Sequence, residues 1–112
     1  EKPAPSKHLA IDAAHYDVVH DGMRIGAIEG TTAGLNMPNV EIAAKTGTAE
    51  LGSLKQYVNS WSVGFFPYKN PRYAFAVIME RGPHTNTVGA TAAVRRTFDW
   101  MAIHTPEYFS EK

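Results

Sequence analysis

The chain has 112 residues, with 11 Lys and Arg balanced by 11 Asp and Glu, and it contains no cysteine. This length allows one small domain or a piece of a larger one. The zero net charge gives no electrostatic basis for nucleic-acid binding or a membrane-surface role. Without cysteine there is no disulfide framework and no thiolate chemistry. The longest plainly apolar run, Tyr73–Met79, is far shorter than the ~20 residues needed to span a bilayer.

Residues 1–11 are rich in proline and lysine and are expected to be a linker or disordered lead-in. They contain no initiator methionine and no apolar signal core, so we expect the chain to be part of a longer polypeptide. A helix is predicted over 13–28, with Asp12 as its N-cap. Its expected buried face consists of apolar residues at helical spacing: Tyr16, Val19, Met23 and Ala27.

Three strands are predicted next. The alternating residues of 41–50 favour the first, and the aromatic and β-branched residues of 57–66 favour the second. The proline-containing turn 67–72 separates the second from 73–80, which is so apolar that both of its faces are expected to be covered. Residues 81–84 are expected to end the sheet. This order predicts a three-strand antiparallel meander.

A second helix is predicted over 88–103, with Thr87 able to cap it. Ala90, Val94, Phe98 and Met101 fall on one face of this helix. Residues 105–112 are expected to be a tail. The order of helix, three strands and helix predicts an α+β fold in which helices pack on a sheet.

The chemical signal is Lys45-Thr46-Gly47-Thr48 in the first predicted strand. Lysine supplies a fixed positive charge, and two nearby threonine hydroxyls can hydrogen-bond one carboxylate. At a sheet edge, unpaired N–H groups could serve a developing oxyanion or pair with an extended peptide. Taken alone, the tripeptide is also compatible with solvated strand residues and a bulge at Gly47.

The sequence around this tetrad resembles the penicillin-interacting serine transferases. The resemblance to class B penicillin-binding proteins, and most closely to the elongation-type penicillin-binding protein 2 branch, covers about residues 12–103. It is carried by five runs that occur in the family's order: VVHDGM at 18–23, GTTA at 30–33, IAAKTGTAE at 42–50, SVGFFP at 62–67 and YAFAVIME at 73–80.

The resemblance implies the C-terminal segment of a transpeptidase domain with the serine β-lactamase-like fold. The family transfers the acyl group of D-alanyl-D-alanine stem peptides from a serine to an amine, and β-lactams mimic the dipeptide. By position, Lys45 would place positive charge near the nucleophile and the substrate carboxylate, which Thr46 and Thr48 would bind. Thr48 would also offer a backbone N–H to the oxyanion. Ala49 and Glu50 would continue the strand beside the ligand, for which Gly47, having no side chain, leaves room.

The chain departs from the family in two motifs. It contains neither the S-x-x-K motif of the nucleophile nor an S-x-N motif ahead of Lys45. Tyr57-Val58-Asn59 imitates the second motif but follows Lys45, so we interpret it as an accident of strand sequence. The chain alone is therefore predicted to be inactive, with the serine on other polypeptide. A piece of a domain is also expected to expose apolar sheet surface.

Two alternatives remain open: a non-catalytic module whose strand edge docks a peptide, and a fragment of a serine β-lactamase or β-lactam sensor. No cofactor or nucleic-acid partner is expected. His15 and His20 lack the i, i+4 spacing of a helical zinc pair, so no metal site is predicted. The resemblance further implies a membrane-anchored parent at the periplasmic face of a bacterial inner membrane, acting with cell-wall elongation proteins in cell-shape maintenance.

Overall fold

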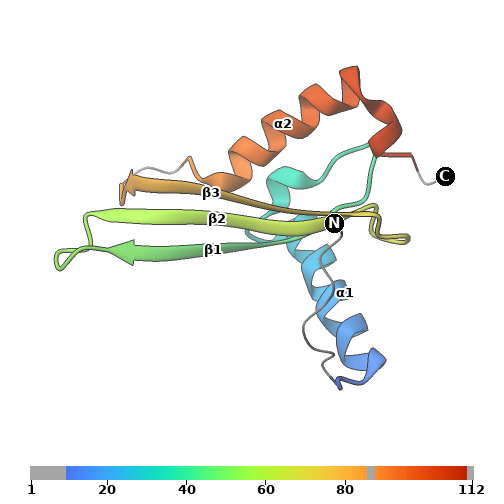
Figure 1. The fold of residues 1–112 in the computed structure, drawn as a ribbon, viewed down its shortest axis with the longest axis horizontal. Coiled ribbons are helices and arrows are strands. Elements are labelled where there is room, and N and C mark those ends of the chain that lie inside the picture. The colour runs from blue at the N-terminus through green and yellow to red at the C-terminus, as the bar shows by residue number, and fades with distance from the viewer. Residues whose placement is uncertain (1–9, 86–87, 111–112) are drawn as a thin grey trace, which may run out of the picture.

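The structure, a computed structural model, describes residues 10–85 and 88–110. Its elements in chain order are α1 (Ala13–Glu29), the 3-10 turn η1 (Ala33–Leu35), β1 (Ala43–Leu51), β2 (Tyr57–Phe66), β3 (Tyr73–Pro83), α2 (Ala90–His104) and the 3-10 turn η2 (Pro106–Tyr108) (Figure 1). The sheet order is β1-β2-β3, and both strand pairs are antiparallel. The predicted α+β fold, with a meander between two helices, is confirmed.

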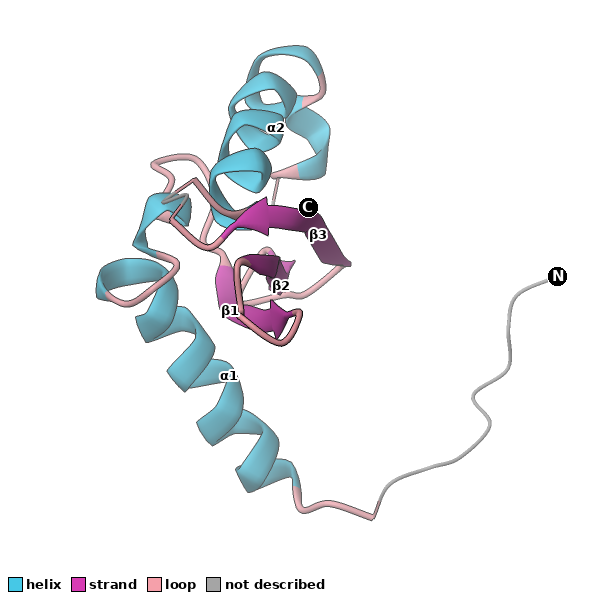
Figure 2. Ribbon diagram, turned by 90° about the vertical axis from the view of Figure 1, so that its left-hand side faces the viewer, coloured by secondary structure: helices cyan, strands magenta, loops and turns pink. Residues whose placement is uncertain are grey.

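Helix α2 lies on one face of the sheet (Figures 1 and 2) and packs there against a hydrophobic core shared with η1, β1, β2 and the loop before β1. Its residues Ala90, Val94 and Phe98 are buried, as predicted, and Met101 packs against the same cluster. The ring of Phe98 lies 4.9 Å from that of Phe66 in an edge-on arrangement. Such aromatic pairs add about 1 kcal/mol beyond their buried area, so this pair stabilises the packing of α2 on the sheet.

The first turn of α2 is capped by a strand residue. Gly89 is the N-cap residue and has no side chain to offer, while the hydroxyl of Ser60 on β2 accepts a hydrogen bond from the Ala90 N–H at 2.9 Å. The predicted cap, Thr87, lies outside the described residues. The start of α2 is thereby fixed directly to the sheet.

The C-terminal segment is more than a tail. After α2, the turn η2 returns the chain to the core, where Phe109 is only 4% exposed. The Phe109 ring lies 5.4 Å from Phe66 and 5.6 Å from Phe98. The expectation for 105–112 therefore needs correction over residues 105–110, because a single aromatic side chain can close a hydrophobic cluster without any periodic pattern around it.

Helix α1 begins where predicted, and the carboxylate of Asp12 accepts a hydrogen bond from the Ala14 N–H at 3.0 Å. Its expected buried face is wrong over the first half. Tyr16 and Val19 are 42% and 58% exposed, and Ala27 is the buried residue of the helix. Both ribbon views show why: α1 meets the sheet near its C-terminal end and projects away from it (Figures 1 and 2).

Strand β3 differs from its prediction in two respects. It continues through residues 81–83 because a bulge places Glu80 and Arg81 opposite the single residue Asn59 and lets pairing resume at Gly82. It is also covered on one face at most: Phe75 and Val77 pack against the core, while Ala74 and Ala76, which alternate with them, are exposed. Apolar content alone predicted two covered faces, but among the described residues only the face toward α2 has a packing layer, where the Phe75 ring lies 5.3 Å from that of Phe98.

The sheet face opposite α2 carries exposed apolar side chains. Trp61 and Val63 of β2 are 39% and 38% exposed, while Ser62 between them is fully buried on the α2 side. This matches the expectation that a piece of a domain exposes apolar sheet surface. No helix among the described residues is long and apolar enough to cross a membrane.

Candidate functional site

The predicted site lies on β1, at the edge of the sheet. The carbonyl of Ala44 accepts from the Thr32 hydroxyl at 3.4 Å, and that of Thr46 accepts from the Lys45 ammonium at 2.7 Å. Both donors lie outside the β1–β2 ladder. Because an antiparallel strand directs every second residue's N–H and C=O to the same edge, the backbone of Thr48 also faces outward. Within the described residues, these two groups of Thr48 have no hydrogen-bond partner.

Lys45 is exposed, and its ammonium group lies back against the outer edge of its own strand. The positive charge therefore sits on the same edge as the outward N–H of Thr48. A carboxylate approaching this edge would meet both a cation and backbone donors, an arrangement in which charge-assisted hydrogen bonds form.

Thr46 is half-buried, and its hydroxyl lies 2.8 Å from the hydroxyl of Thr31. Thr31 belongs to the turn between α1 and η1, 15 residues earlier in the chain. The structure thus brings together two hydroxyls that the sequence analysis treated separately.

Gly47 pairs with Trp61 in a regular register without a bulge, so the alternative of a bulge at this position is wrong. A Cβ atom on Gly47 would lie 3.4 Å from the Trp61 Cβ, an ordinary contact. Ala49 pairs with Asn59 and is exposed, and it points to the same face as Gly47 because both are odd-numbered positions of the strand.

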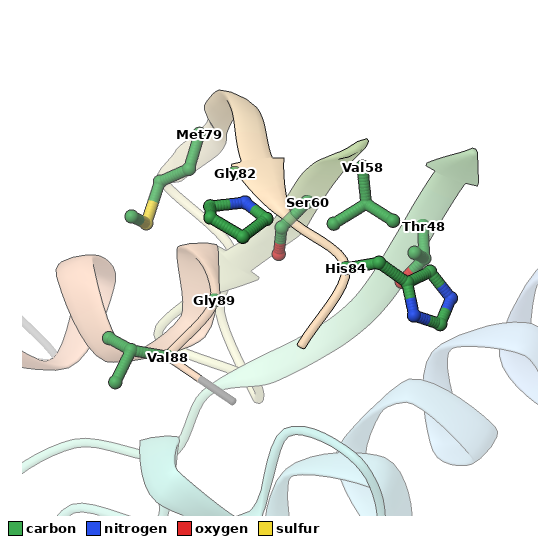
Figure 3. A pocket seen from close by; sticks show the side chains of 9 residues that line it. Thr48, Val58, Ser60, Met79, Gly82, His84, Val88 and Gly89 are labelled. Carbon is green, nitrogen blue, oxygen red and sulfur yellow. The ribbon is translucent and has the colours of Figure 1, made fainter. Parts of the chain in front are cut away.

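Thr48 lines a pocket of about 230 Å³ on the α2 side of the sheet (Figure 3). In that view Thr48 and His84 lie at one end, and Met79 and Val88 at the other. Ser60, whose hydroxyl caps α2, also lines it. The pocket adjoins the free edge at Thr48 and has room for a small side chain or acyl group.

Near the end of β1, the carboxylate of Glu50 contacts basic side chains of the neighbouring loops. The carboxylate of Glu50 forms an ion pair with Lys55 at 2.7 Å and lies 3.7 Å from His84 Nε2. His84 also donates its backbone N–H to the Gln56 carbonyl at 2.8 Å. These contacts tie the loop after β3 to the β1–β2 connection, next to the pocket.

Asn59 has a structural role. Its side-chain oxygen accepts the Arg81 N–H at 2.9 Å, the group that the bulge in β3 leaves without a ladder partner. The Y-x-N imitation is therefore part of the bulge, and Asn59 lies one strand inward from the free edge. Among the described residues, no three His, Cys, Asp or Glu side chains lie together as a metal site would require.

Sequence reasoning missed the residues that fix the outer edge of β1. The carbonyls of Ile42 and Ala44 are occupied by Arg24, at 3.1 Å, and by Thr32, at 3.4 Å. Thr31 holds the Thr46 hydroxyl. The available signal was the Gly-Thr-Thr turn at 30–32, which was used for its likeness to a family but not for its contacts.

Residues 1–99 of the chain match the family described as "Penicillin binding protein transpeptidase domain". The chain belongs to this family. Two curated relatives are named as peptidoglycan D,D-transpeptidases. PbpA of Mycobacterium tuberculosis (strain ATCC 25618 / H37Rv) is 41% identical over 61 residues, covering 51% of this chain and 12% of PbpA. MrdA of Acinetobacter baumannii is 33% identical over 87 residues, covering 66% of this chain and 13% of MrdA.

Solved structures agree with this membership. Pseudomonas aeruginosa PBP2 in complex with WCK 5153 has a TM-score of 0.69 at 25% identity, covering 100% of this chain and 26% of that one. Penicillin-binding protein 2B of Streptococcus pneumoniae has a TM-score of 0.69 at 28% identity, covering 90% and 17%. Penicillin-binding protein A of M. tuberculosis, solved as a penicillin G acyl-enzyme, has a TM-score of 0.62 at 29% identity. The match covers 86% of this chain and 22% of that one.

These relatives identify the chain as a C-terminal transpeptidase segment of the class B, PBP2-like type. It spans about an eighth of the length of the curated relatives it matches. The tetrad Lys45–Thr48 lies inside the family match, on an edge strand of this chain's sheet.

Proposed function

We propose that this segment supplies the substrate-binding strand of a peptidoglycan D,D-transpeptidase. The observation that carries the proposal is the free outer edge of β1 at Thr48, flanked by the Lys45 ammonium and the Thr46 hydroxyl. A D-alanyl-D-alanine terminus carries a carboxylate and a peptide carbonyl, which are the groups that such an edge can bind.

In this role Lys45 attracts the terminal carboxylate and the developing negative charge near the nucleophile. Thr46 and Thr48 donate their hydroxyls to the carboxylate. The Thr48 N–H stabilises the oxyanion of the tetrahedral intermediate, and its C=O accepts an amide N–H of the donor peptide. Gly47 and Ala49 have no side chain or a small one, which leaves space for the ligand beside the strand. β-Lactams mimic the dipeptide and are proposed to use the same contacts. One relative has been solved as a penicillin G acyl-enzyme, which supports penicillin as a ligand of this class of domain.

The nucleophile belongs to polypeptide outside these 112 residues, because the sequence contains no S-x-x-K motif. The complete protein is proposed to be anchored in the inner membrane of a bacterium, with its transpeptidase domain in the periplasm and cell-wall elongation proteins as partners.

Labelling with fluorescent penicillin tests whether the nucleophile lies outside these 112 residues. The isolated chain should show no covalent label, whereas the complete transpeptidase domain that contains it should be labelled stoichiometrically. A stable label on the isolated chain would place the nucleophile within these residues and refute that part of the proposal.

Substitutions in the complete domain test the role of the strand. Lys45→Met should lower the second-order acylation rate by about 10²–10³-fold, the range found when one preorganised donor is removed. Lys69→Met is the matched control, because Lys69 lies in the β2–β3 turn and pairs with Glu41 at 3.3 Å. Equal rates for the two variants would remove Lys45 from the site.

The lifetime of the label on the complete domain separates the transpeptidase from a serine β-lactamase and from a non-catalytic module. A transpeptidase releases the penicilloyl group slowly, a β-lactamase hydrolyses it repeatedly, and a non-catalytic module never forms it. Counting the antibiotic molecules consumed per protein therefore distinguishes the three.

A further inference from the structure

We propose that Thr31, outside the motif, is a positioning residue that orients the Thr46 hydroxyl toward the substrate carboxylate. The inference deepens the proposed function and rests on it. Its observation is the contact of 2.8 Å between the two hydroxyl oxygens, which joins the turn after α1 to the motif strand.

The direction of this hydrogen bond decides what Thr46 can do. A threonine hydroxyl has a single hydrogen to donate. If Thr46 gave that hydrogen to Thr31, it would present only lone pairs to an approaching carboxylate and would repel it. If Thr31 donates instead, the hydrogen of Thr46 remains free for the carboxylate. A bound anion therefore selects the order Thr31 to Thr46 to carboxylate.

This order is cooperative. A hydroxyl that accepts a hydrogen bond becomes a better donor, because each bond in a chain polarises the next. Thr31 thus strengthens the bond that Thr46 makes to the ligand, without touching the ligand in this arrangement. It also favours one χ1 rotamer of Thr46, whose half-buried hydroxyl makes no other hydrogen bond within the described residues.

The turn that carries Thr31 is itself held in place. Its neighbour Thr32 is fully buried and donates its hydroxyl to the Ala44 carbonyl. The Thr32 N–H donates to the Gly26 carbonyl at 3.2 Å, and the Gly30 N–H donates to the same carbonyl at 3.1 Å. A Cβ atom on Gly30 would lie 2.8 Å from the Gly26 Cα. The close approach of these two glycines shapes the turn so that the Thr31 hydroxyl lies beside the Thr46 hydroxyl.

The test compares Thr31→Val with Thr31→Ser in the complete transpeptidase domain. Valine has nearly the same shape but no hydroxyl, and serine keeps the hydroxyl. We expect Thr31→Val to lower the second-order rate of acylation by penicillin about 10-fold, as for loss of one hydrogen bond to a charge-binding group. Thr31→Ser should restore most of that rate. Thr97→Val, on the exposed side of α2, is the control.

A second ligand separates positioning from simple damage to the fold. A penicillin whose carboxylate is esterified has no anion to accept the hydrogen bond from Thr46. Thr31→Val and the wild type should therefore react with this ester at equal, low rates. Equal losses for the acid and the ester, or no loss for the acid, would overturn the role of Thr31. A wild-type domain that fails to react with penicillin would instead overturn the proposed function.

Discussion

Helix α2 and helix α1 both carry an apolar stripe, but they use it differently. The first buries Ala90, Val94 and Phe98 against the sheet, whereas the second buries Ala27 near its C-terminal end and leaves Tyr16, Val18 and Val19 exposed. An apolar stripe needs a facing surface, and only α2 runs along a face of this sheet (Figure 2). The comparison shows that similar periodicity can serve a core in one helix and an unpartnered surface in another.

Apart from the buried contact at Ala27, α1 is attached mainly through polar and aromatic side chains. Arg24 donates to the Ile42 carbonyl at 3.1 Å and lies 3.5 Å from Glu41, and Tyr68 of the β2–β3 turn donates to the carboxylate of Asp21. The ring of His20 lies 4.7 Å from Phe65. These contacts fall in the second half of the helix, so its first two turns depend on local interactions. Under the proposed function, the exposed apolar side chains of α1 and of the sheet face at Trp61 pack against the rest of the transpeptidase domain.

The largest effect is expected from Phe98→Ala in α2. The side chain is 5% exposed and packs on Phe66, Phe75 and Phe109. Its loss should lower the free energy of unfolding by about 4 kcal/mol, as for other buried Phe to Ala changes. Urea denaturation followed by circular dichroism measures this. Ile103→Ala on the exposed side of the same helix should stay within about 0.5 kcal/mol. Similar losses for both would contradict the packing described for α2.

A smaller effect is expected from Asp12→Ala, which removes the cap of α1. Loss of such a cap costs about 1 kcal/mol of helix stability. Because the first turns of α1 have little packing, the cost should fall on them alone, and hydrogen exchange there should become about fivefold faster. The urea midpoint of the chain should not move. Asp12→Asn retains a capping oxygen and is the control. Unchanged exchange in Asp12→Ala would mean that the cap does not hold the helix.

The contact between Tyr68 and Asp21 predicts a pH dependence. The hydrogen bond to Asp21 raises the pKa of the Tyr68 hydroxyl above its ordinary value of 10.0, and desolvation and the negative charge of Asp21 act in the same direction. Because folding raises the pKa of Tyr68, the contact with Asp21 stabilises the folded chain fully below pH 10.0. This contribution to the free energy of unfolding is lost as the pH rises through the pKa of Tyr68 in the folded chain. Titration by tyrosinate absorbance should show a late-ionising component from Tyr68 that disappears in Tyr68→Phe and moves to lower pH in Asp21→Asn.

The smallest effect is expected from Val18→Ala, paired with Val94→Ala in α2. Val18 is 70% exposed and Val94 is 2% exposed. The same chemical change should cost less than about 0.5 kcal/mol at the first position and roughly 2 kcal/mol at the second. Thermal denaturation of the two variants is sufficient. Comparable losses at both positions would show that α1 is packed in the isolated chain.

Local patterns determined the secondary-structure elements of this segment and its candidate site residues. Helical spacing located both helices, the proline-rich turn located the hairpin, and Asp12 was correctly identified as a cap, because each of these depends on neighbours a few residues apart. The tetrad Lys45–Thr48 was likewise visible in the sequence, as was its alternation along a strand.

Tertiary structure alone decided which apolar stripe is buried, how the bulge at Asn59 carries β3 past Arg81, and how Phe109 returns to the core. It also placed Thr31 against Thr46 and left the backbone of Thr48 on a free edge. The physical reason is the same in each case: burial and hydrogen-bond partners depend on elements distant in the sequence, and periodicity within one element does not specify what lies opposite it.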